Sequence, residues 1–180
     1  MSTHLILGGA RSGKSGFAER LARERGLPTS VIVTAEALDA EMAQRIDRHR
    51  NDRPSQWRTV EAPLALVAAL AVEAAPERCV IVDCLTLWLT NLMAGSDTEG
   101  QRYEDTLVRV KQERSALTEL IPQLRGTILI VANEVGLGLV PDTPLGRVFR
   151  DEAGRLNQAV ASACSQVTFI AAGLPLRLKG

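Results

Sequence analysis

The sequence predicts an α/β fold in which helices cover both faces of a mainly parallel sheet. Short apolar runs of the kind that form buried strands alternate along the 180 residues with longer segments of helical periodicity. The first apolar run is followed directly by a glycine-rich loop and a helix-forming segment, as in α/β proteins that bind phosphate groups. No internal repeat or low-complexity tract divides the chain, so we expect residues 1–180 to form one domain.

The glycine-rich loop has a recognisable pattern: a glycine, four residues, then Gly-Lys-Ser. An apolar run at 5–7 precedes it and a helical segment at 16–22 follows it, which is the context that the pattern requires. Lys14 can reach the β- and γ-phosphates of a nucleotide, and Ser15 can offer its hydroxyl to Mg²⁺. We therefore expect a P-loop NTPase-like fold and a nucleotide site. Its expected loop residues are Gly8, Gly9, Ala10, Arg11, Ser12, Gly13, Lys14 and Ser15.

The remaining elements follow from apolar runs, periodicity and breaker residues. Gly26 and Pro28 end the first helix, Pro54 ends the second, and Pro144 begins the last. The further strands are expected at residues 30–35, 79–83, 127–132 and 166–171. The further helices are expected at about residues 39–50, 63–75, 103–124 and 144–164.

Charge and cysteine content restrict the class of partner. The 21 basic residues balance the 21 acidic ones, so no overall field recruits nucleic acid or a membrane surface. No apolar run is long enough to span a bilayer, and we expect a cytoplasmic protein. Cys79, Cys84 and Cys164 lack metal-ligand spacing and lie in apolar or small-residue surroundings, which predicts buried thiols in a reducing compartment.

Three carboxylates are candidates for ligand contacts, and two of them, Asp83 and Glu134, lie at or after the ends of expected strands, where open α/β sheets bind ligands. Asp83 ends an apolar run, the position at which phosphate-loop enzymes hold Mg²⁺ through a carboxylate; a cap for the next element is the alternative. Glu61 follows a turn and can also be an ordinary solvated loop residue. Glu134 stands in a glycine-bearing loop after a strand and could bind substrate or metal.

The two histidines differ in their surroundings. His4 lies at the start of the first strand and is most simply structural. His49 shares a predicted helix face with Met42 and Ile46, so the composition of this segment alone favours a partly buried histidine side chain. Five arginines surround it, however, and can form a phosphate cradle in which a neutral imidazole acts as a nucleophile. These arginines are Arg45, Arg48, Arg50, Arg53 and Arg58.

Several segments, in order along the whole chain, resemble the family of bifunctional adenosylcobinamide kinase / adenosylcobinamide-phosphate guanylyltransferases of cobalamin biosynthesis. The matching segments are residues 8–15, 39–46, 53–59, 90–92, 133–136 and 149–158. The resemblance implies phosphorylation of adenosylcobinamide with ATP or GTP. It also implies transfer of GMP from GTP to adenosylcobinamide-phosphate through a covalent guanylyl-histidine, which is His49 by alignment.

The same resemblance implies the remaining site residues and a homotrimer. Mg²⁺, for which the loop pattern and the strand end predict Ser15 and Asp83 as ligands, would neutralise charge on the phosphates together with Lys14 and the arginines. Further nucleotide contacts are implied for Thr34, Ala35, Glu36, Arg53, Glu61 and Asp83. The chain departs from the family pattern at Arg48 and Gln56, where a histidine can occur, and at Asp83, where a glutamate can. Two alternatives are a small-molecule kinase without a covalent intermediate and a nucleotide-dependent switch.

Overall fold

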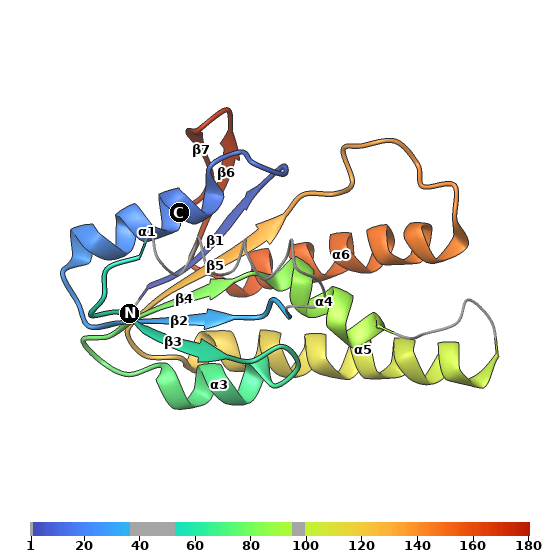
Figure 1. Ribbon diagram of the computed structural model, residues 1–180, viewed down its shortest axis with the longest axis horizontal. Coiled ribbons are helices and arrows are strands. Elements are labelled where there is room, and N and C mark those ends of the chain that lie inside the picture. Colours follow the sequence, from blue (N-terminus) through green and yellow to red (C-terminus); the bar gives the residue numbers. More distant parts are fainter. Residues whose placement is uncertain (1, 37–52, 95–99) are drawn as a thin grey trace.

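The computed structural model describes residues 2–36, 53–94 and 100–180, and its described strands form one seven-stranded sheet (Figure 1). The strand order is β3-β2-β4-β5-β1-β6-β7. All neighbouring pairs are parallel except β6 and β7, which form an antiparallel hairpin at one edge. The strands are β1 Ser2–Gly8, β2 Thr29–Val33, β3 Arg58–Glu61, β4 Cys79–Asp83, β5 Thr127–Asn133, β6 Gln166–Ala171 and β7 Leu174–Lys179.

Figure 1 shows helix α1 on one face of the sheet and helices α3 to α6 on the other. The alternation of side chains along β1 serves both layers: Ile6 packs with Ala18 and Ala22 of α1, whereas Leu5 and Leu7 belong to the core beneath the other helices. The helices are α1 Lys14–Arg25, α3 Leu66–Glu73, α4 Leu85–Met93, α5 Gln101–Leu120 and α6 Pro144–Ala163, with a 3-10 turn at Ile121–Gln123. The prediction of a mainly parallel sheet covered on both faces is therefore confirmed.

Most of the expected elements appear close to their predicted bounds. The strands β4 and β6 have the predicted bounds, because each is an apolar run flanked by polar or turn-forming residues. Pro144 begins α6 as expected, with the Thr143 hydroxyl accepting a hydrogen bond from the Gly146 amide. All three thiols are free and buried, as predicted.

Three described elements were not predicted: β3, α4 and β7. The helix expected at 63–75 is shorter, at Leu66–Glu73, and only one side of it is buried, since Val72 is 77% exposed. The helix expected at 39–50 lies outside the described residues. Within the part of the chain that the structure describes, no helix has both the length and the apolar character needed to cross a bilayer.

Candidate active site

The glycine-rich loop joins the carboxyl end of β1 to the amino end of α1, as the P-loop motif requires. Gly8 must be glycine, because a Cβ there would lie 2.4 Å from the Ile170 carbonyl oxygen. Gly13 has φ +99° and precedes the first residue of α1, a left-handed conformation that favours glycine. The Phe17 amide donates to the Gly13 carbonyl at 2.9 Å and begins the hydrogen-bond ladder of the helix.

Two polar side chains of this loop lie inside the space that it encloses. Lys14 is only 7% exposed, and its ammonium donates to the Gly9 carbonyl at 2.6 Å, back across the loop. The Ser12 hydroxyl is buried and has no hydrogen-bond partner among the described residues. Because an unpaired buried hydroxyl costs free energy, a ligand oxygen at this position would be stabilising. The loop is therefore built to receive an oxyanion.

Strand register brings the other predicted groups to the same edge of the sheet. Asp83 ends β4 opposite Val33 of β2, and Val33 in turn lies opposite Glu61, the last residue of β3. Glu61 is exposed and is the last residue of the strand β3, so the alternative interpretation as a loop residue does not hold. The segment Thr34–Glu36 continues from β2 at this edge, and Gly8 ends β1 there. The expected nucleotide contacts therefore share one rim, as open parallel sheets arrange them.

Asp83 connects the P-loop to a buried arginine. The Ser15 hydroxyl donates to Asp83 Oδ1 at 3.4 Å, and Arg53 Nη2 donates to Oδ2 of the same carboxylate at 3.1 Å. Arg53 Nε also lies 3.4 Å from Glu19 Oε1 on α1. The Arg53 side chain is 6% exposed and Glu19 is 13% exposed, so water screens these ion pairs only weakly. Asp83, Arg53 and the first turns of α1 thus form one polar cluster.

The oxygen atoms of Ser15 and Asp83 fit Mg²⁺. A hydroxyl and a carboxylate are hard ligands, and Mg²⁺ usually takes few protein ligands and completes its shell with water and phosphate oxygens. No group of three or more His, Cys, Asp or Glu side chains in the described ranges could hold a metal by itself. The donor set therefore suits a cation that arrives with a nucleotide, rather than a metal held by protein ligands alone.

The end of β2 is fixed by hydrogen bonds that the sequence did not reveal. The Thr34 hydroxyl donates to the Cys84 carbonyl at 2.7 Å and accepts from the Cys84 amide at 2.9 Å. Asn91 of α4 donates to the Thr34 and Pro63 carbonyls at 2.7 and 3.0 Å. Thr34 is fully buried, Ala35 is half-buried and Glu36 is exposed, so only the last two can present side chains at the rim. The one sequence signal for the role of Asn91 in holding the end of β2 was its polar side chain within a largely apolar segment.

The loop after β5 also lies beside the P-loop. The Glu134 amide donates to the Gly8 carbonyl at 2.9 Å. The Glu134 carboxylate accepts from the Gly136 amide at 2.6 Å and so stabilises its own loop. Asn157 of α6 and Thr86 of α4 bind the Asn133 backbone at 3.1 and 2.7 Å. Glu134 therefore has a local structural role in addition to its place on the rim.

Comparison with known proteins decides the family. The model of the family described as cobinamide kinase / cobinamide phosphate guanyltransferase matches residues 4–178. The chain belongs to this family. It is 55% identical over 176 residues to the bifunctional adenosylcobalamin biosynthesis protein CobP of Pseudomonas aeruginosa, covering 98% of this chain and 96% of that one. It is 36% identical over 179 residues to the CobU protein of Escherichia coli K12, covering 97% of this chain and 98% of that one.

A solved structure supports the fold independently of sequence. The RadB recombinase superimposes with a TM-score of 0.51 at 12% identity, covering 93% of this chain and 73% of that one. At this identity the likeness concerns the fold alone, and it agrees with the predicted P-loop NTPase-like architecture.

The cobinamide kinase / guanyltransferase chain contains two histidines, of which the structure describes one. His49, the expected nucleophile, lies outside the described residues; of the five arginines that are close to it in sequence, the structure describes Arg53 and Arg58. His4 is 8% exposed within β1, and its Nε2 lies 2.8 Å from the Thr168 hydroxyl. Burial lowers the pKa of His4 below 6.5, and the charges of Arg177 and Arg25 lower it further. These surroundings agree with the expected structural role of His4.

Proposed function

We propose that the chain phosphorylates adenosylcobinamide with ATP or GTP and then transfers GMP from GTP to adenosylcobinamide-phosphate. The products of the second reaction would be adenosylcobinamide-GDP and pyrophosphate. The observation that carries this proposal is the P-loop beside Asp83 and Arg53, in a chain that matches the kinase and guanyltransferase family over residues 4–178. Both reactions begin by binding a nucleoside triphosphate, and this rim offers one site for it.

The P-loop residues would bind and orient the triphosphate. Backbone amides of residues 8–15 and the Ser12 hydroxyl would donate hydrogen bonds to phosphate oxygens. The Lys14 ammonium, which donates to the Gly9 carbonyl in this structure, would donate to the β- and γ-phosphates instead. Ser15 and Asp83 would hold Mg²⁺, which supplies positive charge that neutralises the phosphates. Phosphoryl transfer depends mainly on position and charge, so these contacts account for most of what the kinase step needs from the protein.

Arg53 would complete this charge arrangement. In the described structure it neutralises Asp83 and Glu19, which lie beside the P-loop. Its planar guanidinium has donors to spare for an additional phosphate oxygen. Ala35, Glu36 and Glu61 would contact the remainder of the nucleotide from the same rim, and Thr34 would hold that rim in place through Cys84.

His49 would carry the guanylyl group. One imidazole nitrogen attacks the α-phosphorus of GTP, a P–N bond forms, and the bond to the leaving pyrophosphate breaks. An oxygen of adenosylcobinamide-phosphate then attacks the same phosphorus, the P–N bond breaks, and the imidazole is restored. Two displacements replace one difficult transfer between phosphates. The family resemblance and the cluster of arginines around His49 in the sequence support this role.

The experiment that tests the proposed function follows both products by mass spectrometry. Purified chain is incubated with adenosylcobinamide, Mg²⁺ and either ATP or GTP. We expect adenosylcobinamide-phosphate with either nucleotide and adenosylcobinamide-GDP only when GTP is present. Formation of the phosphate alone in the presence of GTP would identify a simple kinase, and turnover of neither corrinoid would identify a switch or binding module.

We further propose that residues 1–180 act as one domain, that the protein is a homotrimer, and that it works in the cytoplasm. The family resemblance supports the trimer, and the buried free thiols suit a reducing compartment. Light scattering coupled to size-exclusion chromatography tests the assembly. A mass three times that of the 19.4 kDa chain is expected, and a monomer would contradict it.

A further inference from the structure

A cavity that no P-loop residue lines lies on the face of the sheet that α1 covers. Its volume is about 380 Å³, and it is bounded by α1, by β1, β5 and β6, and by the edge strand β7. Ser2, Thr127 and Gln166 line it, and each is the first residue of its parallel strand. The cavity is therefore at the amino edge of the sheet, whereas the P-loop is at the carboxyl edge.

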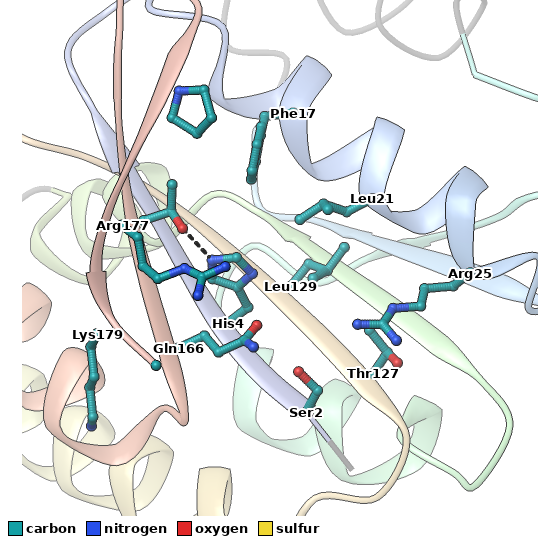
Figure 2. A pocket seen from close by; sticks show the side chains of 13 residues that line it. Ser2, His4, Phe17, Leu21, Arg25, Thr127, Leu129, Gln166, Arg177 and Lys179 are labelled. Atoms are coloured by element: carbon teal, nitrogen blue, oxygen red, sulfur yellow. Dashed lines mark hydrogen bonds between the residues drawn. The ribbon is translucent and has the colours of Figure 1, made fainter.

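The charged side chains that line this cavity are all basic. Arg25, the last residue of α1, and Arg177 of β7 both line it, and no acidic side chain does so in the part of the chain that the structure describes. Neither guanidinium has an ion-pair partner within the described ranges. Figure 2 shows Arg177 beside His4 and Arg25 reaching in from α1 on the side of Thr127. Both arginines contribute to the lowered pKa of His4, so their fields overlap within the cavity.

Lys179 also belongs to this lining, but its ammonium group is directed at α6. Its ammonium donates to the carbonyls of Ala161 and Ser162 at 2.9 Å, near the carboxyl end of α6. Figure 2 accordingly shows the Lys179 side chain pointing away from His4 and Gln166. The carboxyl-terminal carbonyls of a helix attract a cation, so this side chain serves to hold β7 in place.

One wall of the cavity is apolar. Phe17, Leu21 and Arg25 follow one another at four-residue spacing along α1, so they share a helix face, and Leu129 of β5 lies below them. The amide of Gln166 and the hydroxyls of Ser2 and Thr127 are on the side of the strands. An apolar wall facing a few convergent polar groups is typical of a small-molecule site, and the volume is in the range of such sites.

We propose that this cavity binds an organic monophosphate with a flat apolar body, at a site separate from the nucleotide site. The body would pack on Phe17 and Leu21, and the phosphate would accept from Arg177 and Arg25. The fork of donors on each guanidinium matches the oxygens of a phosphate dianion. His4 also lines the cavity and would keep its hydrogen bond with the Thr168 hydroxyl when the ligand is bound.

The test is calorimetric titration of the full chain with phenyl phosphate, with benzoate and phenol as comparison ligands. Saturable binding of phenyl phosphate is expected, with weaker binding of benzoate and none of phenol. Arg177→Gln and Arg25→Gln should each weaken it about tenfold or more, since each removes a charge-assisted hydrogen bond. Gln166→Glu should weaken it as well, because the new carboxylate repels the phosphate while pairing with the arginines.

Two control variants separate this site from other sources of binding. Arg125→Gln removes an exposed arginine outside the cavity, and Lys14→Ala removes the main phosphate contact of the P-loop. Arg125→Gln should leave the affinity for phenyl phosphate unchanged, and Lys14→Ala should leave unchanged the binding that depends on Arg177 and Arg25. The proposal is overturned if the wild-type chain shows no saturable binding at millimolar ligand, if the cavity arginines do not matter, or if Lys14→Ala abolishes the binding. Circular dichroism of each variant shows that a loss of binding is not a loss of fold.

Discussion

Arg53 and Asp83 form an ion pair at 3.1 Å between a side chain that is 6% exposed and one that is 20% exposed. The same carboxylate accepts from Ser15 at 3.4 Å, and the same guanidinium contacts Glu19 of α1. One arginine therefore links the end of β4 to the helix that begins in the P-loop. This relation explains how a residue far from the glycine-rich loop in sequence can control both the stability and the charge of the nucleotide site.

Arg53→Gln should destabilise the fold by about 2 kcal/mol, because it leaves two weakly screened carboxylates without their shared partner. Urea denaturation of the variant and the wild-type chain measures the difference. Arg125→Gln, at an exposed position, is the matched control and should change stability by less than about 0.5 kcal/mol. Equal stability of Arg53→Gln and wild type would show that the ion pairs contribute nothing.

Ser15→Ala and Asp83→Asn should raise the Mg²⁺ concentration needed for half-maximal kinase activity. Ser15→Ala removes the hydroxyl ligand of the proposed Mg²⁺ site, and Asp83→Asn removes the negative charge of the other ligand, without a large change in volume. Initial rates measured across a range of Mg²⁺ concentrations test this. An unchanged Mg²⁺ requirement in both variants would remove these residues from the proposed metal site.

Lys14→Ala should weaken nucleotide binding about tenfold to a hundredfold, since a charge-assisted contact to phosphate contributes about 1.5–3 kcal/mol. The measurement is the dissociation constant of GTP with Mg²⁺, from calorimetry. Lys14→Arg keeps the charge but not the compact ammonium inside the loop, so it should recover only part of the affinity. Unaltered affinity in Lys14→Ala would contradict the assigned role.

The fold should lose stability on mild acidification because of His4. Its pKa is below 6.5 in the folded chain, so the unfolded chain takes up a proton first as the pH falls. The contribution of neutral His4 to the free energy of unfolding is fully present above the pKa that His4 has in the unfolded chain. It is lost as the pH falls through the lower pKa of His4 in the folded chain. Urea midpoints between about pH 7.5 and about pH 5.5 should fall less steeply for His4→Gln than for wild type. Parallel slopes would show that His4 titrates normally.

The three thiols should resist modification until the chain unfolds. Burial raises the pKa of Cys79 and of Cys164 to about 11 and also raises that of Cys84. Because the reactive species is the thiolate, a disulfide reagent at about pH 8 should label none of them in the folded chain and all three in urea. Rapid labelling of the folded chain would show that at least one thiol is accessible. The same pKa values predict that stability falls as the pH rises above about 9.

The fold could be predicted where local patterns and tertiary environment agree. The apolar runs of β4 and β6 are buried parallel strands, as predicted. The phosphate-loop pattern correctly predicted the strand β1 before it and the helix α1 after it. Helix α4 was missed although its buried residues Leu85, Trp88, Leu89, Leu92 and Met93 have helical spacing, because it is only nine residues long and follows almost directly on the apolar strand β4. Trp88 is buried in it and donates to the Leu64 carbonyl. The short strand β3 has charged residues at both ends and so lacks the usual strand signal. The strand β7 was missed although Leu174, Leu176 and Leu178 recur at the two-residue period of a strand.

Within the site, sequence reasoning found the P-loop and Asp83 but not the contacts that organise them. Arg53 and Glu19 are 34 residues apart, and Asn91 and Thr34 are 57 apart, so no local spacing connects either pair. Only the strand order brings these elements together, because β4 lies between β2 and β5 while β1 lies beyond β5. The assignment of His49 remains a prediction, since that residue is outside the described ranges.

The central claim is that one nucleotide site supports transfer to two acceptors, of which His49 is one. Its most direct test is incubation of the chain with Mg²⁺ and GTP labelled at either the α- or the γ-phosphate, followed by denaturing electrophoresis. We predict an acid-labile, alkali-stable label from the α-phosphate alone, absent in His49→Ala and reduced in Lys14→Ala. His4→Asn is the matched control and should retain the label, because His4 is the other histidine of the chain and lies on β1 away from the P-loop rim. No label on the wild-type chain, or a label that survives His49→Ala, would contradict the account.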